Sequence, residues 1–325
     1  MFRRFIPGTR CLLSALALVA PAAGASESYP SHPIKMIVPY PAGGGTDVLV
    51  RTVMQEMSKT LGQSIVVINR PGAGGKIGVA ALKVEKPDGY TMGLSSTSTM
   101  AVYPAIEPKL SYDPIKSFVH GGMIAKTPGV LLASRSLPAD NLDDLKKLLA
   151  AKPDDYVIAS GTPTTFLSAE MYKQAIKSKM QTVQYNGSPP VLLDLVPGRV
   201  HLTFMIAGAA IPEIKNGTVK ALAITWDKRI PQLPEVPTMK EAGMGQVEAT
   251  TWIGIAFPAG TPTPIVNKVN AAMNQALQQP QVAKRLVELG YFAEGGSPEQ
   301  HTRTVASELT LWSKIYTNAG SPGMQ

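Results

Sequence analysis

The sequence predicts an α/β protein built from two lobes with a ligand cleft between them. Apolar runs of strand character alternate with amphipathic stretches of helical spacing along the chain. Beyond a short N-terminal leader, about 300 of the 325 residues remain, more than one ordinary hydrophobic core accommodates. Several strands end in turns rich in glycine, serine and threonine, and open α/β sheets bind ligands at the carboxyl ends of their strands.

The first part of the chain predicts two strand–turn–helix units and a third strand. Strands are expected over residues 34–39, 64–68 and 90–94. Apolar residues from Val50 to Leu61 are spaced by four, three and four positions, which predicts a helix over 47–61 that Gly62 ends. A glycine turn at 71–75 leads into a second helix.

The remainder continues the alternation and then becomes helical. Strands are expected over residues 130–133, 157–159, 182–185, 200–205 and 221–225, and helices over 141–150, 166–177 and 190–196. Three further helices, over 264–277, 280–289 and 298–318, each begin at a proline, which the first helical turn tolerates. The chain is therefore expected to visit each lobe in turn, with lobe one at 29–126 plus 251–325, lobe two at 127–250, and a hinge at the two crossings.

Residues 1–25 predict a cleavable secretory signal peptide and a periplasmic protein. A basic segment comes first, an apolar run over 11–20 follows, and small residues lead to a cleavage site after Ala25. A membrane anchor is the alternative, but this run has only half of the roughly 20 apolar residues that span a bilayer. The single cysteine, Cys11, lies in this segment, which leaves no disulfide or thiolate metal site in the mature chain.

The charge of the chain favours an anionic small molecule over nucleic acid. Lys and Arg number 31 against 23 Asp and Glu, a formal net charge of +8. Basic residues do not cluster among aromatic ones as they do in nucleic-acid-binding proteins. A mild positive balance promotes encounter with small anions, although it also describes a merely soluble basic protein.

The glycine, serine and threonine turns suggest how such an anion could be held. Helix N-termini carry unpaired N–H groups and a partial positive charge, and glycine lets a ligand approach the backbone. Together these features form an anion site without arginine or metal. Any one turn is better explained as an ordinary connection, so an anion site is expected only because several such turns occur in one chain.

Motifs for nucleotide binding, catalysis or a metal site are absent from the sequence. Near Lys76 a Walker-like stretch has Ile77 in place of the required hydroxyl residue and Arg70 in place of the first glycine. The four histidines are far apart, and neither an HExxH pair nor a GxSxG elbow occurs. We therefore expect no cofactor, no metal and no enzyme activity. A triad assembled only in space stays an alternative.

Several stretches taken together resemble one known family. They are residues 37–47 (IVPYPAGGGTD), 67–75 (VINRPGAGG), 183–188 (VQYNGS), 221–225 (ALAIT), 233–238 (LPEVPT) and 258–262 (PAGTP). The chain resembles the periplasmic solute receptors of tripartite tricarboxylate transporters, the Bug family, from about Ile34 to its end. The resemblance implies a type-2 periplasmic-binding-protein fold with a hinge and a closing cleft. It also implies a monomer that holds a small carboxylate through backbone N–H groups and water, and a partner membrane transporter.

The resemblance also implies which residues contact the ligand. The first lobe would supply Tyr40, Pro41, Ala42, Gly43, Gly44, Thr46 and Asp47, with Ser95, Ser96 and Thr97 beside them. The second lobe would supply Ser160, Thr162, Thr164, Thr165, Tyr185, Gly187 and Ser188, with Met205 as an apolar wall. Asp47 would rigidify the glycine loop or reach the ligand through water, or it would only favour the dipole of its helix.

The sequence departs from the family pattern at His201 and Met205, where the family commonly carries acids. An apolar Met205 in the cleft would favour an aromatic or short aliphatic carboxylate. Two other functions stay open on the sequence alone. One is a ligand-sensing module that signals to a membrane sensor, and the other is a periplasmic hydrolase.

Overall fold

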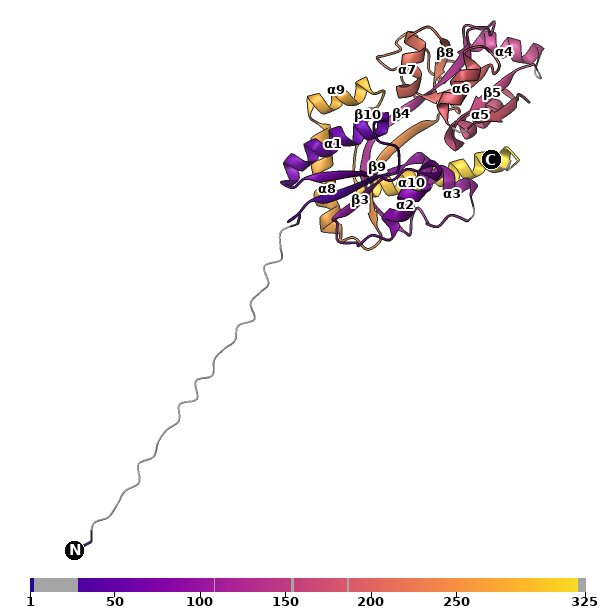
Figure 1. Cartoon of the computed structure of the whole chain (residues 1–325). Coiled ribbons are helices and arrows are strands. Elements are labelled where there is room, and N and C mark those ends of the chain that lie inside the picture. The colour runs from indigo at the N-terminus through magenta and orange to yellow at the C-terminus, as the bar shows by residue number, and fades with distance from the viewer. Residues whose placement is uncertain (3–28, 108, 153–154, 186, 321–325) are drawn as a thin grey trace.

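The computed structural model describes residues 1–2, 29–107, 109–152, 155–185 and 187–320 (Figure 1). The predicted signal peptide and its cleavage after Ala25 lie outside these ranges, apart from the first two residues. Within them, no helix combines the length and the apolar character that a bilayer crossing requires.

The first lobe is built on a sheet of strands β1, β2, β3, β9, β10 and the first part of β4. Their bounds are β1 Ile34–Val38, β2 Ile65–Asn69, β3 Thr91–Ser96, β4 Phe118–Ser134, β9 Thr250–Pro258 and β10 Phe292–Gly295. Strand β1 lies parallel between β2 and β3, while β9 is antiparallel to both β3 and β4. The helices of this lobe are α1 Gly45–Leu61, α2 Lys76–Lys83, α3 Tyr103–Ile106, α8 Thr263–Leu277, α9 Pro280–Glu288 and α10 Pro298–Asn318.

The second lobe repeats the α/β arrangement around the last part of β4. Its strands are β5 Val157–Ser160, β6 Gln181–Gln184, β7 Leu202–Ile206 and β8 Val219–Ile224. Its helices are α4 Leu142–Ala151, α5 Pro163–Ile176, α6 Ser188–Leu195 and α7 Ala207–Lys215. Strand β5 lies parallel to β6 and β7, and both β7 and β8 pair with β4.

Strand β4 connects the lobes without a loop. It pairs with β9 as far as Pro128, with β7 from Gly129 onward and with β8 from Val130 onward. At the change of partner, Gly129 N donates to Thr225 Oγ1 at 2.8 Å. The chain therefore crosses between the lobes inside a continuous strand.

The C-terminal helix α10 contacts both lobes. It packs against β4 and also reaches α5, near the end labelled C in Figure 1. Its Trp312 and Ile315 are buried in one apolar cluster with Leu167 and Tyr172 of α5. The last turns of a helix assigned by sequence to lobe one thus help to form the core of lobe two.

Local sequence explains where the helices begin and end. Helix α1 ends at Gly62, whose φ of 70° is left-handed and whose N–H donates to Ser58 O. Helix α5 begins with a capping box in which Thr162 and Thr165 satisfy each other's backbone N–H groups, and Pro163 occupies its first position. Helix α6 also has a proline in its first turn, but among the described residues no side chain caps its start.

Candidate functional site

A cavity of about 660 Å³ lies between the two lobes. The first lobe contributes Tyr40, Gly74, Lys76, Ser98, Tyr103 and Glu107 to its wall. The second lobe contributes Ser160, Gly161, Thr162, Gln184, Tyr185 and Gly187. Its volume is in the range of small-molecule sites.

Three helices start at this cavity. Helix α2 begins at Lys76, α5 begins after Thr162, and α6 begins after Gly187. The capping box satisfies the start of α5, whereas among the described side chains none caps α2 or α6. Helix α6 begins at Ser188, and the two residues after it are prolines without an N–H. Ser188 is therefore the only one of the first three residues of α6 that carries an amide N–H. Lys76 N already donates to Ala73 O, so α2 brings mainly the positive potential of its first turn, and α6 brings the Ser188 amide, to one anion.

Two glycines hold the second-lobe turns together. Gly187 N donates to Gly161 O at 2.9 Å, and Tyr185 N donates to Ser160 O at 2.9 Å. A Cβ on Gly161 would lie 2.6 Å from Gly187 O, so any larger residue would push the two turns apart. Gly161 therefore sets the spacing between the starts of α5 and α6.

The first-lobe wall carries an ion pair and an aromatic ring. Lys76 Nζ lies 2.6 Å and 2.8 Å from the two carboxylate oxygens of Glu107. The same ammonium lies 4.7 Å from the centre of the Tyr103 ring. Burial, and then the charge of Glu107, raise the pKa of Tyr103, so its hydroxyl stays protonated. A Cβ on Gly74 would collide with that hydroxyl, which explains the glycine there.

Hydroxyl groups also lie beside the cavity. Tyr40 Oη lies 2.9 Å from Ser96 Oγ. Burial raises the pKa of Tyr40 to about 12, and the contact with Ser96 only partly offsets this effect. Ser98 Oγ of the first lobe lies 3.0 Å from Thr164 Oγ1 of the second. Neutral donors and a direct contact between the lobes thus border the cavity.

Asp47 organises the first glycine loop instead of lining the cavity. Its carboxylate accepts hydrogen bonds from Gly43 N at 2.9 Å, Arg51 Nε at 2.9 Å and Asn69 Nδ2 at 2.8 Å. Burial opposes ionisation, but these hydrogen bonds outweigh it, so the pKa of Asp47 lies below its ordinary value. Asn69 Nδ2 also donates to Tyr40 O at 3.0 Å, which connects this network to the cavity wall.

The structure brings some of the predicted ligand contacts to the cavity and leaves others outside it. The predicted residues that line it are Tyr40, Ser160, Thr162, Tyr185 and Gly187. The loop residues Pro41, Ala42, Gly43 and Gly44 are exposed and are not part of its wall. Thr46 Oγ1 lies 3.2 Å from Tyr291 Oη, and Ser188 begins α6 just behind Gly187.

Other predicted contacts are buried in structural roles. Ser95 Oγ lies 3.2 Å from His301 Nε2, and Thr97 Oγ1 accepts a hydrogen bond from Trp252 N at 2.9 Å. Thr165 serves the capping box of α5. Met205 is 2% exposed in an apolar cluster of lobe two, where it pairs across strands with Val130. Because its side chain packs into that core, Met205 forms no wall of this cavity.

The sequence analysis missed the first-lobe residues Gly74, Lys76, Tyr103 and Glu107. The glycine turn before Lys76 was recognised, but it was not assigned to the site. Tyr103 and Glu107 follow a π-helical turn, η2 (Ser98–Val102), that has no periodic sequence signal. Only the tertiary fold brings Glu107 to Lys76, 31 positions away.

Two of the four histidines meet inside lobe one. The rings of His120 and His301 have centroids 4.7 Å apart, and His301 contacts Ser95. Burial holds the pKa of His301 well below its ordinary value, as the neighbouring His120 does in addition. Ser95 and His301 are both fully buried, so a solute in the cavity does not reach them. In the described part of the chain, no cluster of three or more His, Cys, Asp or Glu residues could hold a metal.

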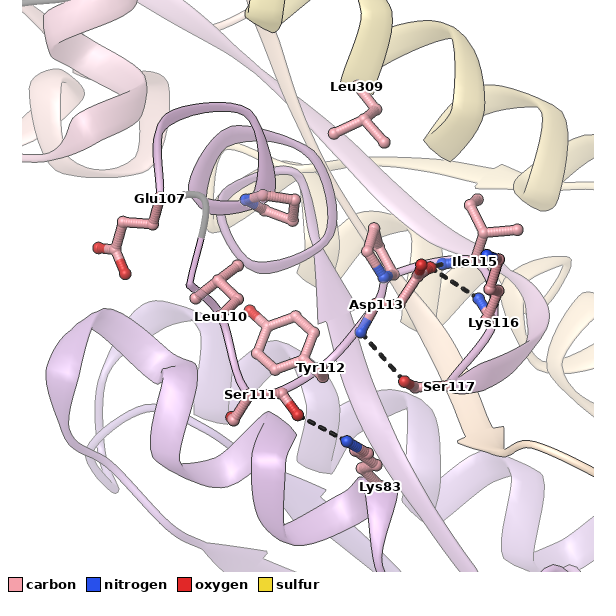
Figure 2. Close-up of a pocket in the computed structure, with 12 residues that line it drawn as sticks. Lys83, Glu107, Leu110, Ser111, Tyr112, Asp113, Ile115, Lys116, Ser117 and Leu309 are labelled. Atoms are coloured by element: carbon pink, nitrogen blue, oxygen red, sulfur yellow. Dashed lines mark hydrogen bonds between the residues drawn. The ribbon is translucent and has the colours of Figure 1, made fainter.

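A second cavity of about 670 Å³ lies on lobe one alone (Figure 2). Several of its polar groups are already paired: Lys83 Nζ donates to Ser111 O at 2.6 Å, and Asp113 Oδ1 accepts from Lys116 N at 2.8 Å. Glu107 lines this cavity too, but Figure 2 shows its carboxylate directed away from Tyr112 and Asp113. None of the predicted site residues lies here, so the cavity between the lobes is the candidate site.

Comparison with known proteins shows the family of this chain. A family profile described as "Tripartite tricarboxylate transporter family receptor" matches residues 49–320. Protein BugT of Bordetella pertussis is 32% identical over 318 residues, covering 95% of this chain and 98% of BugT.

Solved structures agree with this assignment. A Rhodopseudomonas palustris protein with adipate superposes with a TM-score of 0.80 at 33% identity, covering 90% of this chain and 98% of that one. MatC from the same species, with bound malate, gives 0.76 at 32%, covering 88% and 99%. The periplasmic binding protein BugD gives 0.77 at 31%, covering 91% and 100%. The chain therefore belongs to the tripartite tricarboxylate transporter receptors of the Bug family and has the two-lobed fold of periplasmic solute-binding proteins.

Proposed function

We propose that this receptor captures a small organic acid in the cavity between its lobes. The observation that carries the proposal is that the uncapped starts of α2 and α6, one from each lobe, meet at that cavity. Such helix starts can hold a carboxylate without a metal or a free arginine. The malate and adipate bound to the two R. palustris relatives support this chemistry.

The body of the ligand would lie against the first-lobe wall. Tyr103 and Ile106 supply apolar surface there, and Tyr40 adds a ring with a polar tip, as Tyr185 does from the second lobe. This surface suits a short aliphatic or aromatic acid. Asp47 would act indirectly, by fixing the loop that precedes α1.

Capture would proceed by hinge closure and end in delivery to a membrane transporter. The proposed lobes are residues 29–126 plus 251–325 and residues 127–250, with the hinge in β4 and β9. The contact between Ser98 and Thr164 supports closure across the cavity. The receptor would act as a periplasmic monomer after removal of residues 1–25.

Thermal unfolding against a panel of carboxylates tests the proposal. A true ligand at 100 times its Kd should add about 2.7 kcal/mol of stability, and titration calorimetry should give one site per chain. The ligand should be recovered unchanged by NMR, because the buried Ser95–His301 pair does not contact the cavity. Turnover of an ester or amide would instead indicate a hydrolase, and a panel without any binder would reject the proposal.

A further inference from the structure

The ion pair between Lys76 and Glu107 stands inside the proposed ligand cavity. Their side chains are 26% and 38% exposed, so both are partly shielded from water. Among the described residues that line the cavity, these two are the only charged side chains. The inference below rests on the proposed function, because it concerns what the same cavity accepts beside the first carboxylate.

The positive charge of Lys76 is already paired with Glu107. Its ammonium contacts both oxygens of Glu107 and lies over the ring of Tyr103. A ligand that drew Lys76 away would have to break this ion pair, which is only partly shielded from water, and the loss would offset part of what the ligand gains from Lys76. The anion-binding capacity of the cavity therefore comes from the helix starts, and it suits one carboxylate.

The carboxylate of Glu107 favours a hydrogen-bond donor in the cavity and disfavours a second anion. An ionised carboxylate accepts hydrogen bonds and donates none, and it repels a second carboxylate brought into the same partly shielded space. Although Glu107 lines both cavities, its carboxylate points away from the one in Figure 2 and is paired with Lys76 of the ligand cavity. It would accept a hydrogen bond from a hydroxyl or amino group of a ligand.

We infer that Glu107 selects monocarboxylates that carry a hydrogen-bond donor at the far end, and disfavours dicarboxylates. This specificity differs from that of the relatives solved with malate or adipate, which are both dicarboxylates. Glu107 acts as an acceptor for the donor group and as a negative screen against a second acid. Lys76 is paired with Glu107 and so is not free for a second carboxylate.

Calorimetry with matched acids tests this inference on the intact protein. The pairs are 4-hydroxybutyrate with succinate, 5-hydroxypentanoate with glutarate, and 6-hydroxyhexanoate with adipate. For at least one length, the hydroxy acid should bind at least tenfold more tightly than the dicarboxylate. In Glu107→Gln the preference should fall at least tenfold or reverse, because the screen is lost and Lys76 is released to pair with a second carboxylate.

Two further variants keep the test decisive. Lys76→Met leaves the negative charge of Glu107 without a cation beside it, so the preference for the hydroxy acid should persist or grow. Glu56→Gln removes a comparable contact, 2.7 Å from Lys59 on α1 and away from the cavity, and should leave the preference unchanged.

Equal or tighter binding of the dicarboxylates by the unmodified protein would overturn the inference. An unchanged preference in a folded Glu107→Gln would overturn it as well. If Glu107→Gln does not fold, loss of the preference in Lys76→Met would do so. Carboxylates that bind without preference contradict only this inference, whereas a panel without any binder contradicts the proposed function itself.

Discussion

Replacing Gly161 by alanine should separate the two second-lobe turns and weaken ligand binding. The added Cβ would lie 2.6 Å from Gly187 O, 2.7 Å from Gly187 C and 2.9 Å from Ser188 N. All three are backbone atoms, which cannot rotate aside. The closest contact must therefore open toward the ordinary range of about 3.4 Å, and the hydrogen bond from Gly187 N to Gly161 O must lengthen with it.

The expected size of the effect follows from these contacts. Overpacking of this kind costs about 1–3 kcal/mol of folding stability. Displacing one N–H donor from a charged acceptor loses about 1.5–3 kcal/mol of binding, which is roughly a 10- to 100-fold increase in Kd. Thermal unfolding measures the first quantity, and calorimetry with the best acid of the panel measures the second.

A matched glycine outside the cavity provides the control. In Gly245→Ala the new Cβ would meet only Lys240, at 3.6 Å or more, so stability and Kd should stay near the unmodified values. A folded Gly161→Ala protein whose Kd changes less than twofold would refute the role assigned to these turns.

Three further predictions concern titratable groups outside the ligand cavity. Asp47→Asn cannot satisfy all three groups that donate hydrogen bonds to the Asp47 carboxylate, so urea unfolding should show a loss of about 3 kcal/mol of folding stability. The control is Asp143→Asn, which is exposed and also lies in a first helical turn, and it should change stability by less than about 0.5 kcal/mol. Burial raises the pKa of Glu308 to about 7, so the native state keeps a proton that the unfolded state releases near pH 4.5. The contribution of Glu308 to stability therefore falls as pH rises from 4.5 to 7. Glu308→Gln should therefore be more stable than the unmodified protein by about 3 kcal/mol at pH 8 and equal to it near pH 4, and an equal difference at both pH values would contradict this. Burial lowers the pKa of His120 to about 4, so its contribution to stability is lost as pH falls from 6.5 to 4. An NMR titration of His120 with a midpoint near 6.5 would contradict this prediction.

Sequence patterns predict most helices but not the strands that connect the lobes. Helices α8, α9 and α10 start within a residue of their predicted positions, because prolines and capping residues define them locally. Only residues 130–133 of the seventeen-residue strand β4 were predicted, and β9 was missed. Much of β4 is buried on both faces and contains glycine, lysine and proline, so it shows neither alternation nor a continuous apolar run.

The second-lobe side of the candidate site could be predicted better than the first. The turns at Ser160 and Tyr185 are local strand-to-helix junctions, and both line the cavity. The ion pair of Lys76 and Glu107 depends on tertiary packing, which single-sequence patterns do not encode. Met205 was predicted from its place in the family pattern, but its neighbours in the strand core decide where the side chain points.

A crystal structure with the tightest-binding carboxylate of the panel tests the central claim most directly. The account predicts one molecule between the lobes, with carboxylate oxygens within hydrogen-bonding distance of backbone N–H groups at the starts of α2 and α6. A ligand bound instead in the cavity beside Tyr112 and Asp113, or held between the lobes by side chains alone, would contradict it.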